Sequence, residues 1–328
     1  MSADRVTGSA PAAVSVLIPA YGTAAYIAET LDSVLAQTRT DWEILVINDG
    51  DPNTPALEAA LEPYRDRIRY IVKENGGLAS ARNAGLQVAQ GRYVALLDSD
   101  DIWEPRFLEL LIEALDAHPR AAAAFPDALI FGGGPWVGKR YFDIYTKPSG
   151  AGAITCERLL RRQCYIFGSL VMRREMLDGQ GGFDAQIRAS EDFDLWLRFT
   201  RAGHEMVYVD EPLVRYRARE TSLSSDASGM YRSLRHVYEK FLRQDGLTDA
   251  ERAAATDALA GVNAELSLAL GRKAFFAGDY ATAKRELSAS NERLRSRKTT
   301  LILAGLSVWP AGTAAAVKWY MRRRGETV

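Results

Sequence analysis

Apolar, β-branched stretches that alternate with helix-patterned stretches are the feature that most constrains how this chain can fold. The segments VSVLIPA (14–20), WEILVIND (42–49), IRYIV (68–72) and YVALLD (93–98) are almost wholly apolar, as is typical of strands buried on both faces of a parallel sheet. Between the first two, residues 24–38 place apolar side chains at helical spacing. This alternation predicts βαβ units, so we expect an α/β fold with an open, mostly parallel, doubly wound sheet.

The rest of the chain changes character twice. A helix, a strand-like run and a glycine-rich loop follow the first hundred residues, and a mixed α and β pattern continues to about residue 220. From about residue 228 the pattern is helical, and residues 270–290 resemble part of a tetratricopeptide hairpin. We therefore expect four parts, in chain order: a flexible tail (1–13), the sheet domain (14–225), a helical extension (226–298) and an apolar, basic C-terminal segment (299–328).

Charge and cysteine content exclude several classes of protein. The 41 basic and 42 acidic residues nearly cancel, so no overall basic field favours nucleic acid as a partner. Cys156 and Cys164 form no CxxC pair and have no clustered histidine, which disfavours a disulfide framework or a zinc site. The first residues lack the pattern of a signal peptide, so we expect a cytoplasmic protein.

The C-terminal segment combines apolar residues with positive charge. Residues 300–325 are apolar for most of their length, but they contain Pro310 and Lys318 and end near three arginines. From Lys284 onward, ten basic residues stand against three glutamates, a balance of about +7. The segment is a marginal membrane span and a better interfacial helix, with a plain core helix as the alternative. We expect peripheral contact with the inner face of a membrane.

Three carboxylates directly follow an apolar strand. Asp98, Asp100 and Asp101 repel one another and raise each other's pKa unless a cation or a hydrogen-bonding ligand lies among them. Oxygen ligands of this kind favour Mg²⁺ or Mn²⁺, and Mg²⁺ is often shared between carboxylates and substrate phosphates. In doubly wound sheets ligands bind beyond the carboxyl ends of the strands, which is where these residues are expected. The alternative is that Asp100 or Asp101 caps the helix entered at Pro105.

Four motifs in order resemble one family of enzymes. SVLIPAYG, VINDG, the run from Glu74 to Asp101 (ENGGLASARNAGLQVAQGRYVALLDSDD) and SEDFDLWLR together are similar to the family 2 inverting glycosyltransferases, which have the GT-A fold. The resemblance covers residues 14–220, about two thirds of the chain. Each motif alone is weak, whereas four in the right order and spacing are specific.

The resemblance implies roles for residues at the ends of the expected strands. Asp98 and Asp100 correspond to the DxD element that contacts the nucleotide ribose and a divalent metal, and Asp100 would ligate the metal directly. Asp49 resembles the aspartate that reads the base, since a carboxylate accepts hydrogen bonds from a base N–H or a ribose hydroxyl. Its alternative is a turn residue.

Three further residues resemble donor-binding positions. Pro19 and Tyr21 correspond to the end of the first strand, which lines the nucleobase pocket. Arg82 resembles the helix arginine that reaches the nucleotide, and its planar fork of donors suits that task. The alternative for Arg82 is a solvent-facing helix charge.

The resemblance also implies a catalytic base. Transfer with inversion is a direct displacement, in which a carboxylate takes the proton of the attacking hydroxyl while the nucleoside diphosphate leaves. Asp192 corresponds to the base and Glu191 to a supporting or acceptor-binding group. Both precede an amphipathic pattern, where the positive end of a helix dipole would stabilise a carboxylate. Favourable first-turn charges without a catalytic role are the alternative.

The chain departs from the family pattern in one place. Many relatives have a histidine shortly after a YR pair, whereas this chain has Arg217 and Arg219. A guanidinium can clamp a diphosphate but cannot be a neutral metal ligand, so completion of the metal site is open. The QxxRW element of processive synthases is not found, which favours single-residue transfer. In the glycine-rich loop, Trp136 and Tyr141 are candidates for stacking on an acceptor sugar.

These interpretations predict a metal-assisted inverting glycosyltransferase. Its partners would be a nucleotide-sugar donor, with UDP favoured and GDP or dTDP open, and a glycan or lipid-linked acceptor in cell-surface polysaccharide or glycoconjugate synthesis. Two alternatives remain. A nucleotidyltransferase with a similar sheet would release pyrophosphate, and a non-catalytic scaffold with a degenerate transferase domain would bind the donor without turnover.

Overall fold

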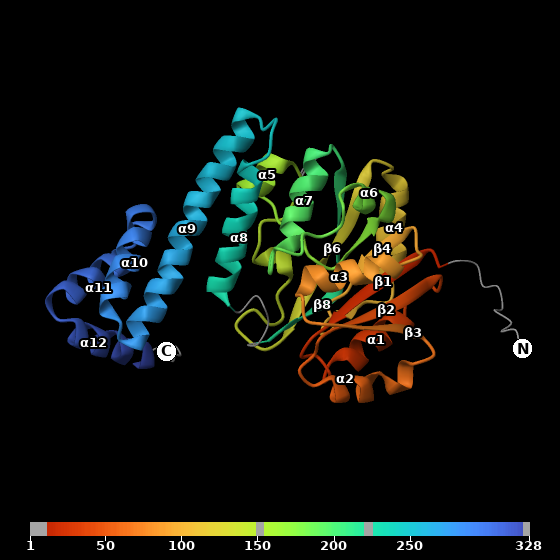
Figure 1. Ribbon diagram of the computed structural model, residues 1–328, viewed down its shortest axis with the longest axis horizontal. Helices are drawn as coiled ribbons and strands as arrows, with labels where there is room; N and C mark the ends of the chain where they lie inside the picture. The colour runs from red at the N-terminus through yellow and green to blue at the C-terminus, as the bar shows by residue number, and fades with distance from the viewer. Residues whose placement is uncertain (1–11, 149–153, 220–225, 324–328) are drawn as a thin grey trace, which may run out of the picture. The chain divides into compact units, whose positions relative to one another are not determined.

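The computed structural model describes residues 12–148, 154–219 and 226–323, which form two compact units, residues 1–221 and 222–328 (Figure 1). Most of the expected tail and the expected boundary at residue 225 lie outside the described residues. The first unit contains the sheet and the second is helical, as the sequence predicts.

An eight-stranded sheet is the frame of the first unit, with strand order β3-β2-β1-β4-β7-β6-β8-β5. The parallel half consists of β1 (Val14–Ala20), β2 (Trp42–Asp49), β3 (Ile68–Lys73) and β4 (Tyr93–Leu96). β7 (Leu170–Arg173) runs antiparallel to both β4 and β6 (Ala121–Gly132). β8 (Glu205–Ala218) is parallel to β6, and the short β5 (Ile102–Trp103) pairs antiparallel with β8 at the edge. The expected α/β class is confirmed, and the sheet becomes mixed beyond β4.

Burial explains why these sequences become central strands. Every residue of β1 is buried, and so are the last six residues of β2, because helices and neighbouring strands cover them. Gly85 lets α3 (Leu78–Val88) approach the sheet, since a Cβ on it would come within 2.9 Å of Leu17 and 3.0 Å of Ile47. Gly50 turns the chain after β2 with a φ of +69°, a conformation that glycine adopts without strain.

The remaining helices of this unit connect or cover the strands. They are α1 (Ile27–Leu35), α2 (Thr54–Leu61), η1 (Glu62–Tyr64), α4 (Phe107–Ala117), η2 (Tyr141–Asp143), α5 (Cys156–Leu160), α6 (Arg174–Gly179) and α7 (Glu191–Arg201). The alternative in which Asp100 or Asp101 caps the helix entered at Pro105 is wrong. α4 begins at Phe107, and its N-cap residue, Arg106, makes no side-chain cap bond.

The second unit is a set of helices around a small core. α8 (Ala227–Leu242), α9 (Asp249–Ala277), α10 (Tyr280–Leu294), α11 (Arg297–Val308) and α12 (Pro310–Arg323) follow one another (Figure 1). The hairpin expected over residues 270–290 is formed by α9 and α10, with Gly278 in the left-handed conformation at the turn. Gly271 allows close packing, because a Cβ there would lie 2.8 Å from Leu287.

The apolar C-terminal segment forms two helices instead of one. α11 and α12 meet at Trp309–Pro310, where the proline cannot continue the preceding helix. No helix among the described residues is both long and apolar enough to cross a membrane.

Candidate functional site

The sheet topology brings the sequence-predicted residues to one edge. Because β1, β2 and β4 are parallel, their carboxyl ends meet at the same edge, where Asp49 ends β2 and where Tyr21 and Asp98 follow β1 and β4. β6 and β8 run in that direction too, since the intervening β7 is antiparallel to both β4 and β6. Arg217 and Arg219 at the end of β8 therefore reach the same edge as Asp98.

Arg82 links two parts of this edge. It lies on α3 and is 3% exposed, so the solvent-facing alternative is wrong. Its Nη1 donates to Oε1 of Glu191 at 2.6 Å, and its Nη2 donates to Oδ1 of Asp98 at 3.1 Å. The guanidinium also lies 5.4 Å from the ring centroid of Phe183. A charge buried this deeply persists because it is paired.

Glu191 and Asp192 are the first two residues of α7, and the backbone just before them is strained. Ser190, just before them, has a φ of +61°, which is unusual for a residue other than glycine and recurs at functional sites. Burial raises the pKa of Glu191 to about 7 against the opposing charge of Arg82. Burial also raises the pKa of the Asp192 carboxyl, again opposed by Arg82. A carboxylate with a raised pKa is better suited to accept a proton near neutrality.

The two arginines at the end of β8 hold the acidic loop that follows β4. Arg219 pairs with Asp100, with Nη2 2.6 Å from Oδ2. The backbone N–H of Arg217 donates to Oδ1 of Asp101 at 2.8 Å, and its Nε donates to the carbonyl of Asp100 at 2.8 Å. Asp101 is buried, and burial with the charges of Asp98 and Asp100 raises its pKa well above the ordinary value. Asp101 therefore joins the loop after β4 to the end of β8.

Three residues that the sequence did not single out contact these arginines. The guanidinium of Arg217 lies 4.7 Å from the ring centroid of Tyr26 and 4.4 Å from that of Phe131, and Arg219 also lies over Tyr26 at 5.1 Å. Nη2 of Arg217 donates to Glu29 at 3.0 Å. Tyr26 and Glu29 lie at the start of the first helix. Only tertiary packing brings them into contact with Arg217 and Arg219.

Asp49 holds the loop that precedes α3. Its Oδ1 accepts from Nζ of Lys73 at 2.6 Å and from the N–H of Gly76 at 3.0 Å, and its Oδ2 accepts from the N–H of Gly77 at 2.7 Å. Asp51, which sequence reasoning missed, accepts from the N–H of Gly22 at 2.6 Å and so ties the end of β1 to that of β2. The turn chemistry of NDGD was the available signal for both residues.

The remaining predicted positions differ in exposure. Pro19 is buried within β1, while Tyr21 at its end is exposed. In the loop after β6, Trp136 is exposed and Tyr141 is half-buried among other aromatic rings. The pKa of Tyr141 is raised well above its ordinary value. Burial is the largest cause, followed by the charges of Tyr145 and Asp192.

Asp98 and Asp100 are two carboxylates that could ligate a divalent cation together, without a third protein ligand. Among the described residues no group of three histidine, cysteine or carboxylate side chains is arranged to hold a metal. The Asp98 side chain is 48% exposed, and each of the two carboxylates uses one oxygen in an ion pair with an arginine. A hard cation that takes its other ligands from phosphates and water fits two such carboxylates.

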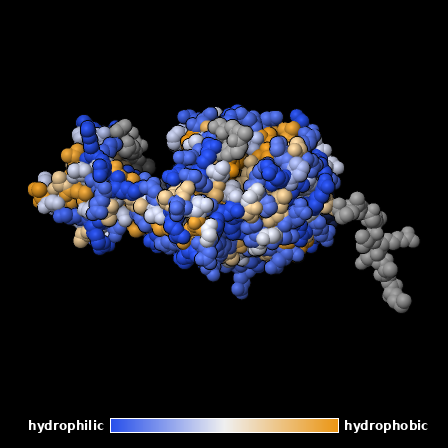
Figure 2. All heavy atoms as spheres, turned by 90° about the horizontal axis from the view of Figure 1, so that it is seen from above, coloured by the Kyte–Doolittle hydropathy of each residue, from blue (hydrophilic) through white to orange (hydrophobic). Residues whose placement is uncertain are grey.

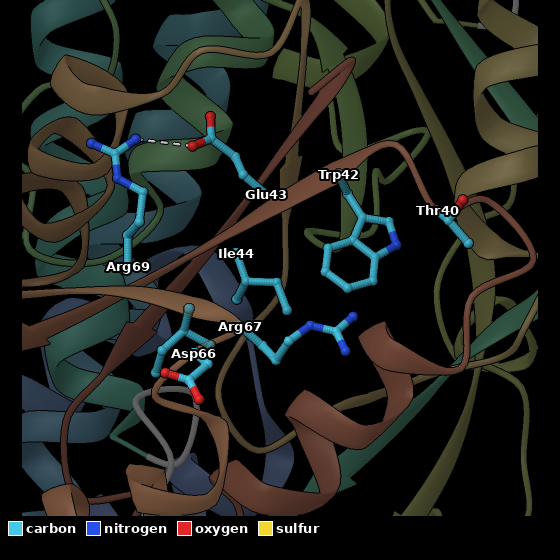
Figure 3. Close-up of a pocket in the computed structure, with 8 residues that line it drawn as sticks. Thr40, Trp42, Glu43, Ile44, Asp66, Arg67 and Arg69 are labelled. Atoms are coloured by element: carbon cyan, nitrogen blue, oxygen red, sulfur yellow. Dashed lines mark hydrogen bonds and ion pairs between the residues drawn. The ribbon is translucent and has the colours of Figure 1, made fainter. Parts of the chain in front are cut away.

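A separate pocket lies at the amino ends of β2 and β3 (Figure 3). It is lined by Trp42, Glu43, Arg67 and Arg69 among others. Glu43 and Arg69 form an ion pair at 2.9 Å, and Arg67 lies over the Trp42 ring at 5.7 Å. Because the sheet half is parallel, this pocket is at the opposite edge from Asp49 and Asp98, so the carboxyl edge remains the candidate site.

Comparisons with known proteins agree with the fold. The structure superposes on Staphylococcus aureus TarS, solved in complex with UDP-GlcNAc, with a TM-score of 0.58 and 19% identity, covering 95% of this chain and 92% of that one. A mannosyltransferase, PcManGT from Pyrobaculum calidifontis, solved with GDP-Man and Mn²⁺, gives a TM-score of 0.60 and 20% identity, covering 94% and 87%. At these identities the likeness shows the GT-A fold.

Sequence comparisons carry the family assignment. An uncharacterized glycosyltransferase of Rickettsia conorii is 31% identical over 73% of this chain and 39% of its own length. The chondroitin synthase of Pasteurella multocida is 30% identical over 58% of this chain and 19% of its own length. The chain thus spans well under half the length of these two relatives. Residues 15–179 match the family described as glycosyl transferase family 2. The chain belongs to glycosyl transferase family 2.

Proposed function

We propose that the protein transfers a sugar, with inversion, from a nucleotide-sugar donor to a hydroxyl of a glycan or lipid-linked acceptor in polysaccharide or glycoconjugate synthesis. The observation that carries this proposal is the Arg82 bridge, which joins Asp98, the proposed donor-side carboxylate, to Glu191 beside the proposed base. This contact supports a donor site and a catalytic base that share one edge of the sheet.

The donor would bind across the ends of β1, β2 and β4. Tyr21 and Asp49 would line the base and ribose side, with Pro19 shaping the end of β1. Asp98 and Asp100 would hold a Mg²⁺ or Mn²⁺, which would offset charge on the diphosphate. TarS with UDP-GlcNAc and PcManGT with GDP-Man support a nucleotide-sugar donor, and we favour UDP.

Asp192 would take the proton from the acceptor hydroxyl as its oxygen attacks the anomeric carbon. The bond to the nucleoside diphosphate breaks on the opposite face, which inverts the configuration. Arg217 and Arg219 would receive the departing phosphates, because guanidinium groups bind phosphate oxygens bidentately. Arg219 would then exchange its present partner, Asp100, for a phosphate.

A screen of nucleotide sugars tests this proposal. We expect one or a few donors to be turned over with release of the nucleoside diphosphate, and we expect EDTA to stop the reaction and Mn²⁺ or Mg²⁺ to restore it. Asp100→Asn should remove most of the activity at saturating metal. Release of pyrophosphate from a nucleoside triphosphate would identify a nucleotidyltransferase, and tight donor binding without any turnover would favour a scaffold.

The second unit carries a surface suited to a membrane. Val308 is 87% exposed and Trp309 70% exposed, and Leu301, Trp319 and Tyr320 are exposed too. The opposite side of these helices is already buried, since Leu306 and Ala314 belong to the core cluster of the unit. In Figure 2 hydrophobic side chains, in orange, gather at the left end, where Figure 1 places α10 and α11. Exposed apolar groups of this extent mark an interaction site.

Positive charge identifies the partner that we propose for this surface. The basic residues Arg297, Lys298, Lys318, Arg322 and Arg323 lie on the same two helices. Aromatic and apolar side chains next to basic ones are typical of helices that lie in the interface of an anionic membrane. We propose that α11 and α12 hold the enzyme at the inner face of a membrane, near a lipid-linked acceptor.

Polar substitutions on this surface should release the protein from vesicles. The double variant Leu301→Asn and Val308→Asn removes exposed apolar groups without touching the core, so we expect a tenfold or greater loss of binding to anionic phosphatidylglycerol vesicles in co-sedimentation. Val72→Asn, at an apolar position on β3 that is 58% exposed, is the control and should bind normally. Unchanged binding by the double variant would contradict the proposal.

A further inference from the structure

Aromatic rings form a continuous group beside the proposed base. Tyr141 lies 4.4 Å from Tyr145 and 5.0 Å from Phe167, measured between ring centroids. Tyr145 lies 5.1 Å from Tyr165, and Phe167 lies 5.8 Å from Tyr216. We call these five residues the aromatic group. Its members come from η2 and the residues just after it, from the segment before β7, and from β8, so the tertiary fold assembles them.

The aromatic group runs from the core to the surface. Phe167 is buried, Tyr141 and Tyr165 are half-buried, and Tyr145 is 40% exposed. Large aromatic side chains usually bury their rings, since each ring removed from water is strongly favourable. Tyr145 therefore leaves stacking surface open, supported from beneath by Tyr141.

The buried end of the aromatic group reaches Asp192. Gly168 directly follows Phe167, and a Cβ built on Gly168 would lie 3.5 Å from Oδ2 of Asp192. The backbone at Gly168 thus lies beside the proposed base. Phe167 and Tyr141 connect this buried end of the aromatic group to the exposed surface at Tyr145.

The two segments that supply Tyr145 and Tyr165 are fastened to each other. The N–H of Tyr165 donates to the carbonyl of Thr146 at 3.1 Å. Within the second segment, the guanidinium of Arg162 lies 5.7 Å from the Tyr165 ring centroid. A surface whose parts are already held together loses little conformational freedom when a ligand binds.

We propose that Tyr145 and Tyr165 are an acceptor subsite that stacks on a pyranose ring, so that the accepting hydroxyl belongs to a sugar ring instead of a polyol or a simple lipid alcohol. This inference rests on the transferase function proposed above. The C–H groups on one face of a pyranose carry partial positive charge and match the negative face of a tyrosine ring. The phenol hydroxyls can bond sugar hydroxyls at the ring edge.

Binding and turnover are measured separately to test this proposal. Saturation-transfer NMR with a panel of methyl pyranosides, compared with glycerol and ribitol, reports binding to the full chain without a donor. Release of the nucleoside diphosphate then reports transfer to the same compounds. We expect pyranosides to bind and polyols not to bind. Tyr145→Ala should raise the acceptor KM about tenfold, the effect of losing a stacked ring, with kcat and the donor KM nearly unchanged.

Two variants separate stacking from other effects. Tyr145→Phe keeps the ring and should keep most of the affinity. Val137→Ala removes another exposed apolar side chain in the preceding loop, one to which no binding role is assigned, and should leave the acceptor KM unchanged.

The outcomes distinguish this proposal from the one on which it rests. Pyranoside binding that is lost in Tyr145→Ala supports the subsite even if no donor is turned over, in which case the transferase proposal alone fails. The subsite is overturned if polyols are preferred, if Tyr145→Ala binds and turns over pyranosides normally, or if Val137→Ala weakens pyranoside binding as much as Tyr145→Ala does.

Discussion

Asp192→Asn is expected to lower the rate of sugar transfer by about 10²–10⁴-fold while the protein stays folded, because amide nitrogen and oxygen cannot accept the acceptor proton as a carboxylate does. The substitution keeps the size of the side chain and its position at the start of α7. Initial rates of nucleoside diphosphate release, with circular dichroism as the check on folding, measure the effect. Donor binding should change little, since Asp192 is assigned to the acceptor side.

Asp194→Asn is the matched control for this prediction. Asp194 lies in the same first turn of α7, but its Oδ2 pairs with Arg198 at 2.9 Å. We expect Asp194→Asn to lower stability more than transfer. The raised pKa of Asp192 adds a second check, since activity should fall as pH decreases through that pKa, and this acidic limb should be absent in Asp192→Asn. Full activity in Asp192→Asn would remove Asp192 from the mechanism.

Arg82→Met is expected to lower the free energy of unfolding by about 3–5 kcal/mol, because it leaves the carboxylate of Glu191 buried without its partner. Both side chains of the Arg82–Glu191 pair are at most 4% exposed. Asp98, the second partner, is half-exposed and can return to water at little cost. Urea denaturation followed by circular dichroism measures the loss.

Two further variants locate the cause of this loss. Arg82→Met combined with Glu191→Met should recover most of the stability, since removing both charges leaves no unpaired group, but the double variant should remain inactive. Arg106→Met breaks the exposed pair with Glu109 and should leave the free energy of unfolding nearly unchanged. Equal losses in Arg82→Met and the double variant would show that packing, and not the buried charge, dominates.

Local pattern was enough to predict the strands of the parallel half. β1 and β2 begin and end where the sequence predicts, because strands buried on both faces require continuous apolar runs and those runs are bounded by turn residues. The strand-end rule then indicated where Asp49 and Asp98 would lie. The mixed half was less predictable, because nothing local specifies that β7 inserts antiparallel between β4 and β6.

In the candidate site too, the sequence predicted some features and not others. Its acidic residues carried a signal in the sequence, since clustered carboxylates after an apolar strand call for a positive partner. The partners themselves are remote in sequence: Arg82 meets Glu191, which is 109 positions away, and the N–H of Arg217 meets Asp101, which is 116 positions away. The helix-cap alternative for Asp101 failed for this reason, as a long-range hydrogen bond competed with the local one.

By itself, the sequence determined the fold class, the order of the strands along the chain and the carboxylates at their ends, because these follow from periodicity and from local turn chemistry. Only the tertiary structure decided which charges are paired and which rings stand exposed. Arg82 became a buried bridge, and Tyr145 became part of an open aromatic surface, through packing between distant segments. The physical reason is that burial and pairing depend on what the fold brings near, and side-chain chemistry alone does not fix that.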